Sequence, residues 1–317
     1  MYISNQLIWT VTDGSQGMIS QVNGLAQQIS SNIVQIKTDL IFPWSKLQPN
    51  LLPVYKWIFK TNLDFTSKPK VVISCGRKSV YTSLYLKKIF RKNIITIHIQ
   101  NPKVNSNKFD FVIVPNHDNF DGTNIYTTTG AIHQFTKKII NDYNDKIEIP
   151  NKENLVSIII GGPNQHYEFS NKVVYDIIKQ VKILKTKYKN YFFCVIPSRR
   201  TDNSSMDILI KELSNIAFVW NKKSKNPYLF SLKFSKYFIV TSDSTSMISE
   251  CAFTGKPIYV YHLPFKRISS RITNFHTEFE KLRITRKYDN ALDNWKYTPL
   301  NEAERIAGIL RSRILNK

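Results

Sequence analysis

Hydroxyl side chains and two carboxylates, Asp243 and Glu250, gather in the run TSDSTSMISE from Thr241 to Glu250. An apolar, β-branched run precedes them and predicts a strand, and a helical pattern follows. Ser244 and Ser246 would lie at the start of that helix, where free N–H groups and the helix dipole favour an anion such as a diphosphate. Glu250 would lie almost two turns in, where a carboxylate can accept hydrogen bonds from both hydroxyls of a ribose. A capped structural helix is the alternative, but it explains the serines and not the acidic residue in an apolar segment.

A pair of arginines follows another apolar run in the same half of the chain. Arg199 and Arg200 come directly after Ser198, and arginine binds phosphate through two parallel hydrogen bonds. Two solvated arginines are the alternative. Gly161 and Gly162 follow the first apolar run of this half, and glycine allows the backbone to approach a ligand closely. These loops predict a phosphate-binding edge.

The first strand-to-helix loop, Thr12–Gly17, contains an aspartate between two small residues. Asp13 would project from the end of a strand, where a fixed carboxylate can act as a general base. Gly14 and Gly17 permit close approach to a ligand, and the helix that follows offers free N–H groups. An N-cap aspartate in a tight turn is the alternative.

Two further loops of the first half carry polar residues. Gly76 and Arg77 begin a predicted helix and suit an anion, although an ordinary turn with a solvated arginine has the same residues. His117 and Asp118 are neighbours that could form a tautomer-fixed pair, but adjacent loop residues often point apart, and a structural turn is the alternative.

The elements that position these residues alternate regularly. Continuous apolar strands separated by helices are typical of parallel sheets covered on both faces. Two such series predict an α/β protein with two Rossmann-like, doubly wound domains facing a cleft, with ligands at the carboxyl ends of the strands. The predicted strands are Gln6–Thr12, Asn32–Lys37, Lys70–Ser74, Ile94–Gln100, Asp110–Val114, Leu155–Ile160, Tyr191–Ile196, Ile216–Trp220, Tyr237–Thr241 and Pro257–Tyr261. The predicted helices are Gly17–Ser31, Leu51–Phe59, Arg77–Phe90, Ser170–Lys187, Ser205–Leu213, Pro227–Phe234, Ser244–Thr254 and Leu300–Leu315.

A polar stretch, Asp145–Asn154, separates the two series and predicts the linker. We therefore expect an N-terminal acceptor-side domain over residues 1–148 and a C-terminal nucleotide-sugar domain over residues 149–317. The last, amphipathic helix could pack back on the N-terminal domain.

Composition excludes several classes of protein. The 317 residues lack an apolar run of about 18 residues and a basic leader, so we expect a cytoplasmic protein. Three separated cysteines in apolar surroundings predict buried thiols rather than a disulfide framework, and no spacing of cysteine or histidine predicts a metal site. The net charge of +22 favours polyanions, although a composition biased toward Lys, Asn and Ile explains part of it. Basic and aromatic residues do not interleave as in a nucleic-acid-binding module, so we expect no specific nucleic-acid partner.

Several segments together resemble a known family. They are TDGSQGMISQVNGLA (12–26), SCGRK (74–78), VPNHDNFDGTNIYTTTGAIHQ (114–134), IIGGPNQHY (159–167), PSRRT (197–201), VWNKKSKNPY (219–228) and VTSDSTSMISECAFTGKPIYVY (240–261). The sequence resembles the family named for a plant mitochondrial-fission protein, whose many bacterial members are assigned as GT-B-type glycosyltransferases. The resemblance implies a GT-B-like fold and nucleotide-sugar binding. It adds Gln21 to the acceptor side, and Asn226, Tyr228, Asp243 and Met247 to the nucleotide-sugar site.

The combined interpretation is a metal-independent glycosyltransferase that uses a nucleotide-diphosphate sugar, needs no other cofactor and serves cell-envelope glycan or glycolipid synthesis. Helix N–H groups with Arg199 and Arg200 would stabilise the diphosphate leaving group, and Asp13 would be the base. Relatives often have His at the position of Met18, which cannot take a proton, so Asp13 is the remaining candidate. A non-catalytic GT-B-like scaffold and a nucleotide-sugar epimerase are the alternatives.

Aromatic and basic residues alternate in the stretch Trp44–Phe59 of the N-terminal half. This composition suits the headgroup boundary of an anionic membrane, so we expect peripheral binding to the inner face of the membrane, next to a lipid-linked or glycan acceptor. Covering the N-terminal sheet is the alternative. Replacing Trp57 and Phe59 with Ser should distinguish the two. The proposed anchors are Trp44, Leu51, Leu52, Val54, Tyr55, Trp57, Ile58 and Phe59, with Lys46, Lys56 and Lys60.

Overall fold

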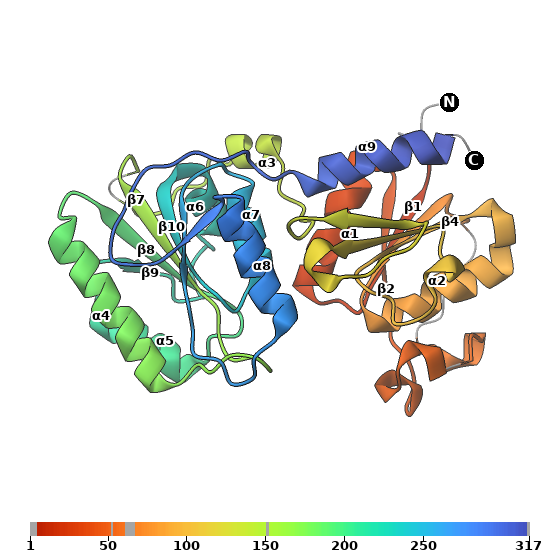
Figure 1. Ribbon diagram of the computed structural model, residues 1–317, viewed down its shortest axis with the longest axis horizontal. Helices are drawn as coiled ribbons and strands as arrows, with labels where there is room; N and C mark the ends of the chain where they lie inside the picture. The colour runs from red at the N-terminus through yellow and green to blue at the C-terminus, as the bar shows by residue number, and fades with distance from the viewer. Residues whose placement is uncertain (1–4, 52, 61–66, 150–151, 316–317) are drawn as a thin grey trace. The chain divides into compact units, whose positions relative to one another are not determined.

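The computed structural model describes residues 5–51, 53–60, 67–149 and 152–315 (Figure 1). The chain divides into two compact units. The first comprises Met1–Gln134 and Asn301–Lys317, and the second comprises Phe135–Leu300. The division expected after residue 148 lies within the second unit.

The first unit is a parallel sheet of six strands in the order β2-β1-β3-β4-β5-β6. One face packs against α1 and α9, whose apolar residues share a core with alternate residues of the strands. The other face packs against α2. The elements are β1 (Ile8–Thr12), α1 (Gln16–Ile29), β2 (Ile33–Lys37), β3 (Val71–Cys75), α2 (Arg77–Phe90), β4 (Ile95–Ile99), β5 (Phe111–Pro115), β6 (Ile125–Thr128) and α9 (Glu302–Leu315). Short 3₁₀ turns lie at Trp44–Lys46, Pro49–Leu51, Lys56–Ile58, Arg91–Asn93, Ser106–Lys108 and Asn116–Asp118.

The second unit is also a six-stranded parallel sheet, in the order β12-β11-β10-β7-β8-β9. Alternate residues of its central strands enter two separate cores, one under α4 and α5 and the other under α6, α7 and α8 (Figure 1). This burial on both faces explains why the strands are continuously apolar. The elements are α3 (Lys137–Asp142), β7 (Leu155–Ile160), α4 (Asn171–Lys187), β8 (Phe192–Pro197), α5 (Asn203–Leu213), β9 (Phe218–Val219), α6 (Tyr228–Phe234), β10 (Ser235–Thr241), α7 (Thr245–Ala252), β11 (Ile258–Tyr261), α8 (Ser270–Lys281) and β12 (Thr285–Lys287).

Each sheet therefore has a point at which the strand order reverses. In the first sheet this switch point lies between β1 and β3, and in the second between β7 and β10. Open α/β sheets bind ligands beyond the carboxyl ends of the strands at such points. The predicted fold class, two doubly wound Rossmann-like units, is confirmed.

The structure also differs from the sequence-based elements. Strands β6 and β12 and helices α3 and α8 were not predicted, because they are short or mainly polar. The predicted helix Leu51–Phe59 is wrong: the chain forms 3₁₀ turns at Pro49–Leu51 and Lys56–Ile58. Pro53 lies between them, and proline disfavours a helix interior. The three cysteines are free and buried, as expected.

Candidate functional site

The carboxyl edge of the second sheet brings together the loops after β7, β8 and β10. Asp243 connects all three loops. Its buried carboxylate accepts hydrogen bonds from the Gly162 N–H (3.1 Å) and the Thr241 hydroxyl (2.6 Å), and it forms an ion pair with Arg200. Burial raises the pKa of Asp243, although the charge of Arg200 opposes that shift. The carboxylate therefore holds the three loops together at the switch point.

The glycines after β7 allow this close packing. A Cβ on Gly161 would overlap with the carboxylate of Asp243, and one on Gly162 would overlap with the backbone of Arg200. Thr201 adds a third connection, because its hydroxyl donates to Gly161 O at 2.5 Å. The glycine pair is thus required by neighbouring protein atoms.

Supporting residues at this edge were not predicted from the sequence. The Asn164 amide donates to Asp243 O at 3.3 Å, and its Oδ1 accepts from the backbone N–H groups of His166 and Tyr167. His276 Nε2, on α8, donates to Ser242 O at 3.0 Å, and burial lowers its pKa to about 4. The only sequence signal for Asn164 is a turn residue after Gly-Gly-Pro; His276 gives none, because α8 was not predicted.

Helix α7 begins directly beyond Asp243. The Ser244 hydroxyl caps the helix by accepting from Met247 N at 3.4 Å. Ser244, Thr245, Ser246 and Met247 are all partly exposed, and no acidic residue lies in the first turn. The predicted hydroxyl cluster therefore surrounds a helix N-terminus that carries a partial positive charge.

Glu250 lies almost two turns into α7 and contacts Tyr228, the first residue of α6. Tyr228 donates its hydroxyl hydrogen bond to Glu250 Oε2 at 2.5 Å, and the Asn226 side chain accepts from Tyr228 N at 2.9 Å. Loss of hydration raises the pKa of Glu250 to about 7, while the Tyr228 hydrogen bond opposes the shift. The structure thus places Asn226, Tyr228 and Glu250 together.

The two arginines differ in their environments. Arg200 is half-buried and held by Asp243, whereas Arg199 is exposed. The Ser198 hydroxyl accepts a hydrogen bond from Arg200 N at 3.2 Å, which fixes the turn from Ser198 to Arg200. A guanidinium has five N–H donors, so Arg200 can bind a further anion while its ion pair is intact.

The switch point of the first sheet contains the loop of Asp13. Asp13 Oδ1 accepts from Ser15 N at 3.0 Å, which fixes the carboxylate in a turn before α1. Gly14 has a positive φ of 95°, and nothing lies within 4 Å of a Cβ on Gly17. The helix N-cap is Ser15 rather than Asp13.

The first turns of α1 contact the end of β3 and the glycine that follows it. Met18 lies against Gly76, where a Cβ would overlap with its sulfur, and Cys75 Sγ lies 3.7 Å from Gln21 Oε1. Arg77 donates to the carbonyl oxygens of Ser45 (2.5 Å) and Leu47 (2.6 Å), so it anchors a neighbouring segment.

His117 and Asp118 lie in the 3₁₀ turn after β5. His117 Nε2 and Asp118 Oδ1 are 3.9 Å apart, beyond hydrogen-bond distance. This geometry does not form the tautomer-fixed pair considered above.

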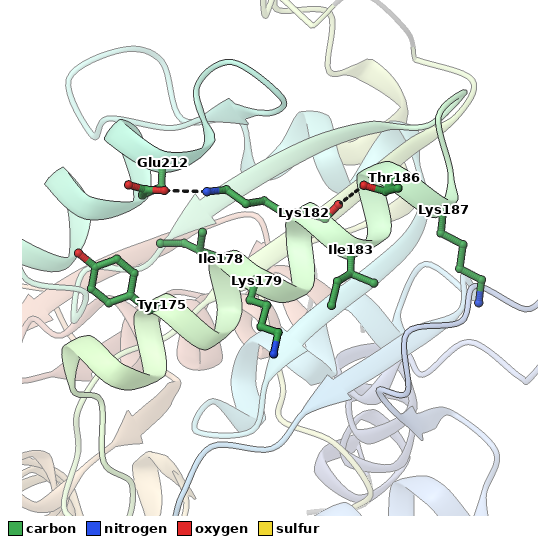
Figure 2. Close-up of a pocket in the computed structure, with 8 residues that line it drawn as sticks. All are labelled: Tyr175, Ile178, Lys179, Lys182, Ile183, Thr186, Lys187 and Glu212. Carbon is green, nitrogen blue, oxygen red and sulfur yellow. Dashed lines mark hydrogen bonds and ion pairs between the residues drawn. The ribbon is translucent and has the colours of Figure 1, made fainter.

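A separate hollow of about 590 Å³ lies on the outer surface of α4 (Figure 2). Apolar side chains and lysines from α4 line it, and Lys182 pairs with Glu212 of α5 at 2.7 Å. It lies away from the loops that follow the strands, so it is not the candidate active site. In the described part of the chain, three or more metal-ligating side chains do not gather, and no helix is both long and apolar enough to cross a bilayer.

Two Rossmann-like units, each with a switch point in the strand order of its parallel sheet, define a protein of the GT-B fold class. The sequence profile of the mitochondrial fission ELM1 family matches residues 16–314. The chain belongs to this family.

Two curated relatives match the chain over most of its length. An uncharacterized protein of Rickettsia prowazekii, RP120, is 27% identical over 96% of this chain and 97% of its own length. The mitochondrial fission protein ELM1 of Arabidopsis thaliana is 26% identical to this chain. The match spans 78% of this chain and 64% of that protein.

Among solved structures, a UDP-N-acetylglucosamine 2-epimerase assigned in Listeria monocytogenes has a TM-score of 0.55 at 12% identity (99% of this chain, 98% of that one). MnaA of S. aureus, crystallised with UDP, has a TM-score of 0.53 at 14% identity (98% and 97%). The glycotransferase of kitacinnamycin has a TM-score of 0.52 at 12% identity (98% and 90%). These likenesses establish the fold.

Proposed function

We propose that the protein is a metal-independent glycosyltransferase that binds a nucleotide-diphosphate sugar at the carboxyl edge of its second sheet. The supporting observation is the switch point between β7 and β10, where Asp243 fixes the loops and α7 begins with exposed hydroxyl groups. The S. aureus protein of the same fold was crystallised with UDP. That ligand class suits a site made of a helix N-terminus and arginines.

The diphosphate would lie at the start of α7. Backbone N–H groups of the first turn and the hydroxyls of Ser244 and Ser246 would bind its oxygens. Arg199 and the free N–H groups of Arg200 would stabilise the charge that develops on the leaving group. Positive charge from the helix and the arginines takes the place of a metal ion in this scheme.

The ribose would be bound by Glu250. Tyr228 occupies one carboxylate oxygen, which leaves the other to accept from the sugar hydroxyls. Because the pKa of Glu250 is about 7, the ionised acceptor forms only as the pH rises through that value. Nucleotide affinity should therefore increase from about pH 6 to pH 8.

Asp13 would take the proton from the acceptor hydroxyl. Its carboxylate is held by the Ser15 N–H at the switch point of the first sheet. The acceptor would be a glycan or lipid-linked sugar, and the product would serve the cell envelope. Asp13→Asn should abolish transfer and leave nucleotide binding unchanged.

Calorimetry with the diphosphates of uridine, guanosine, cytidine and adenosine tests the donor site. Titrations in EDTA should show binding of at least one of them, and Glu250→Gln should weaken it about tenfold, as expected for a hydrogen bond to a charged group. Glu212→Gln is the matched control, because that residue lies in the same unit in an exposed ion pair. Absence of binding by all four diphosphates would refute the donor site.

Product analysis with the matching sugar donor then separates the activities. Release of diphosphate only with an acceptor supports a transferase. A changed sugar without an acceptor would indicate an epimerase, and binding without turnover would indicate a scaffold. Either result would overturn the proposed reaction while keeping the binding site.

A further inference from the structure

An exposed aromatic lobe projects from the first unit between β2 and β3, drawn in orange-red in Figure 1. Phe42 is 78% exposed and Trp57 is 53% exposed, and Leu51 and Tyr55 are exposed beside them in the sequence. Soluble proteins rarely leave several large apolar side chains uncovered in one segment. We call the segment from Phe42 to Trp57 the aromatic lobe. Its exposed large apolar residues are Phe42, Leu47, Leu51, Tyr55 and Trp57, and Leu52 lies outside the described residues.

The lobe is held firmly by the domain beneath it. Leu40, Ile58 and Phe59 are buried against Tyr81, and the Ile41 N–H donates to Ile58 O at 2.9 Å. Phe59 is only 9% exposed, so it belongs to the core and is not a surface anchor. The exposed side chains are therefore presented on a fixed base.

Contacts within the lobe order its rings. Trp44 meets Trp57 edge-on with centroids 4.8 Å apart, and Tyr55 stacks on Trp57 at 6.2 Å. Lys88 Nζ lies 4.0 Å from the centroid of Tyr55 and donates to Val54 O at 3.3 Å. Trp44, Tyr55 and Trp57 therefore form one ring cluster, with the Lys88 ammonium against Tyr55.

The charge of the lobe has a single sign. No acidic residue occurs between Asp39 and Asp64, whereas the segment contains Lys46, Lys56 and Lys60. Asp39 pairs with Lys60 at 3.6 Å, and within the described residues Lys46 and Lys56 have no acidic partner at salt-bridge distance. An anionic surface would complement this charge.

We infer that the aromatic lobe inserts into the headgroup region of an anionic lipid membrane. Tryptophan, tyrosine and lysine are enriched at membrane interfaces, whereas lysine is depleted from protein–protein interfaces. Each lysine near an anionic surface changes the affinity about fivefold, and the exposed rings add an apolar contribution. The proposal does not depend on nucleotide binding.

Sedimentation with lipid vesicles tests it on the full chain. The wild type should bind phosphatidylglycerol–phosphatidylcholine vesicles at low salt, and bind pure phosphatidylcholine vesicles at least tenfold less well. Phe42→Ser combined with Trp57→Ser leaves the charge unchanged and should reduce binding by roughly tenfold or more. Lys46→Gln combined with Lys56→Gln should weaken binding to anionic vesicles by about 25-fold relative to the wild type. Its binding to pure phosphatidylcholine vesicles should be unchanged.

Tyr175→Ser combined with Ile183→Ser is the matched control, because Tyr175 is also 53% exposed but lies on α4 of the second unit. The control should bind vesicles like the wild type, and thermal unfolding should show that every variant is folded. Failure of the wild type to bind anionic vesicles would overturn the proposal. Full binding by Phe42→Ser with Trp57→Ser would do so too, because the net charge alone would then explain the association. Self-association that this double variant abolishes, without vesicle binding by the wild type, would assign the lobe to a second copy of the chain.

Discussion

Replacing Glu250 with glutamine should stabilise the protein above pH 7 and leave it unchanged near pH 4. Glu250 is partly buried, and its nearest described partner is the neutral hydroxyl of Tyr228. Ionising this side chain in the folded state is therefore unfavourable. Glutamine keeps the shape and a carbonyl oxygen for the Tyr228 hydrogen bond, but it does not ionise.

The magnitude follows from the shift in pKa. The value rises from 4.5 to about 7 on folding, and each unit corresponds to about 1.4 kcal/mol, so the full effect is about 3 kcal/mol. A raised pKa for an acid means that the folded state binds the proton more tightly. The wild type therefore keeps this contribution below about pH 4.5 and loses it as the pH rises to about 7. Glutamine does not ionise, so the variant keeps this contribution at every pH. Its free energy of unfolding should therefore exceed that of the wild type by up to about 3 kcal/mol above pH 7.

Urea unfolding of both proteins at several values between about pH 4 and pH 8 measures the difference. Taking the difference cancels the titration of other groups, which both proteins share. Glu212→Gln should change stability by less than about 1 kcal/mol at every pH, as expected for an exposed ion pair. Parallel pH profiles for wild type and Glu250→Gln would refute the reasoning, because the carboxylate would then be hydrated in the folded state.

Three further variants or groups have defined expectations. Asp243→Asn should cost about 2–4 kcal/mol in urea unfolding, because the Arg200 guanidinium loses its counter-charge, whereas the exposed Asp207→Asn should be near neutral. Gly24→Ala should destabilise α1, because its Cβ would overlap with the backbone carbonyl of His133, while Gly17→Ala in the same helix should be neutral or stabilising by up to about 1 kcal/mol in thermal unfolding. The His98 imidazole should stay neutral by NMR from pH 8 to about pH 5, since burial lowers its pKa to about 3; protonation within that range would contradict its buried position.

Much of the fold could be predicted because buried parallel strands have an unmistakable composition. Strands such as β7 and β10 are apolar on both faces, since each face packs against helices. The same argument cannot find β12, a short edge strand of threonine and two charged residues. It also cannot predict α8, because most residues of that helix are polar and only two buried phenylalanines, Phe275 and Phe279, mark its core-facing side.

The candidate site could be predicted by position but not by role. Loops after apolar strands were expected to carry the ligand-binding residues, and the structure places Tyr228 beside Glu250 and Arg200 beside Asp243. Sequence alone could not show that Arg200 has an ion pair, because its partner is distant in the chain. It also could not show that Arg77 binds the backbone of the aromatic lobe.

The two acidic residues at the edge of the second sheet, Asp243 and Glu250, differ in whether neighbouring protein groups satisfy their carboxylates. Asp243 is fully enclosed, yet a guanidinium, a hydroxyl and a backbone N–H all satisfy its carboxylate. Glu250 has one hydroxyl donor and, within the described residues, no cation at salt-bridge distance. A carboxylate in that condition costs stability unless another molecule supplies donors. Asp243 thus maintains the shape of the edge, whereas the ionised form of Glu250 would gain stability from the ribose hydroxyls that the proposed function places beside it.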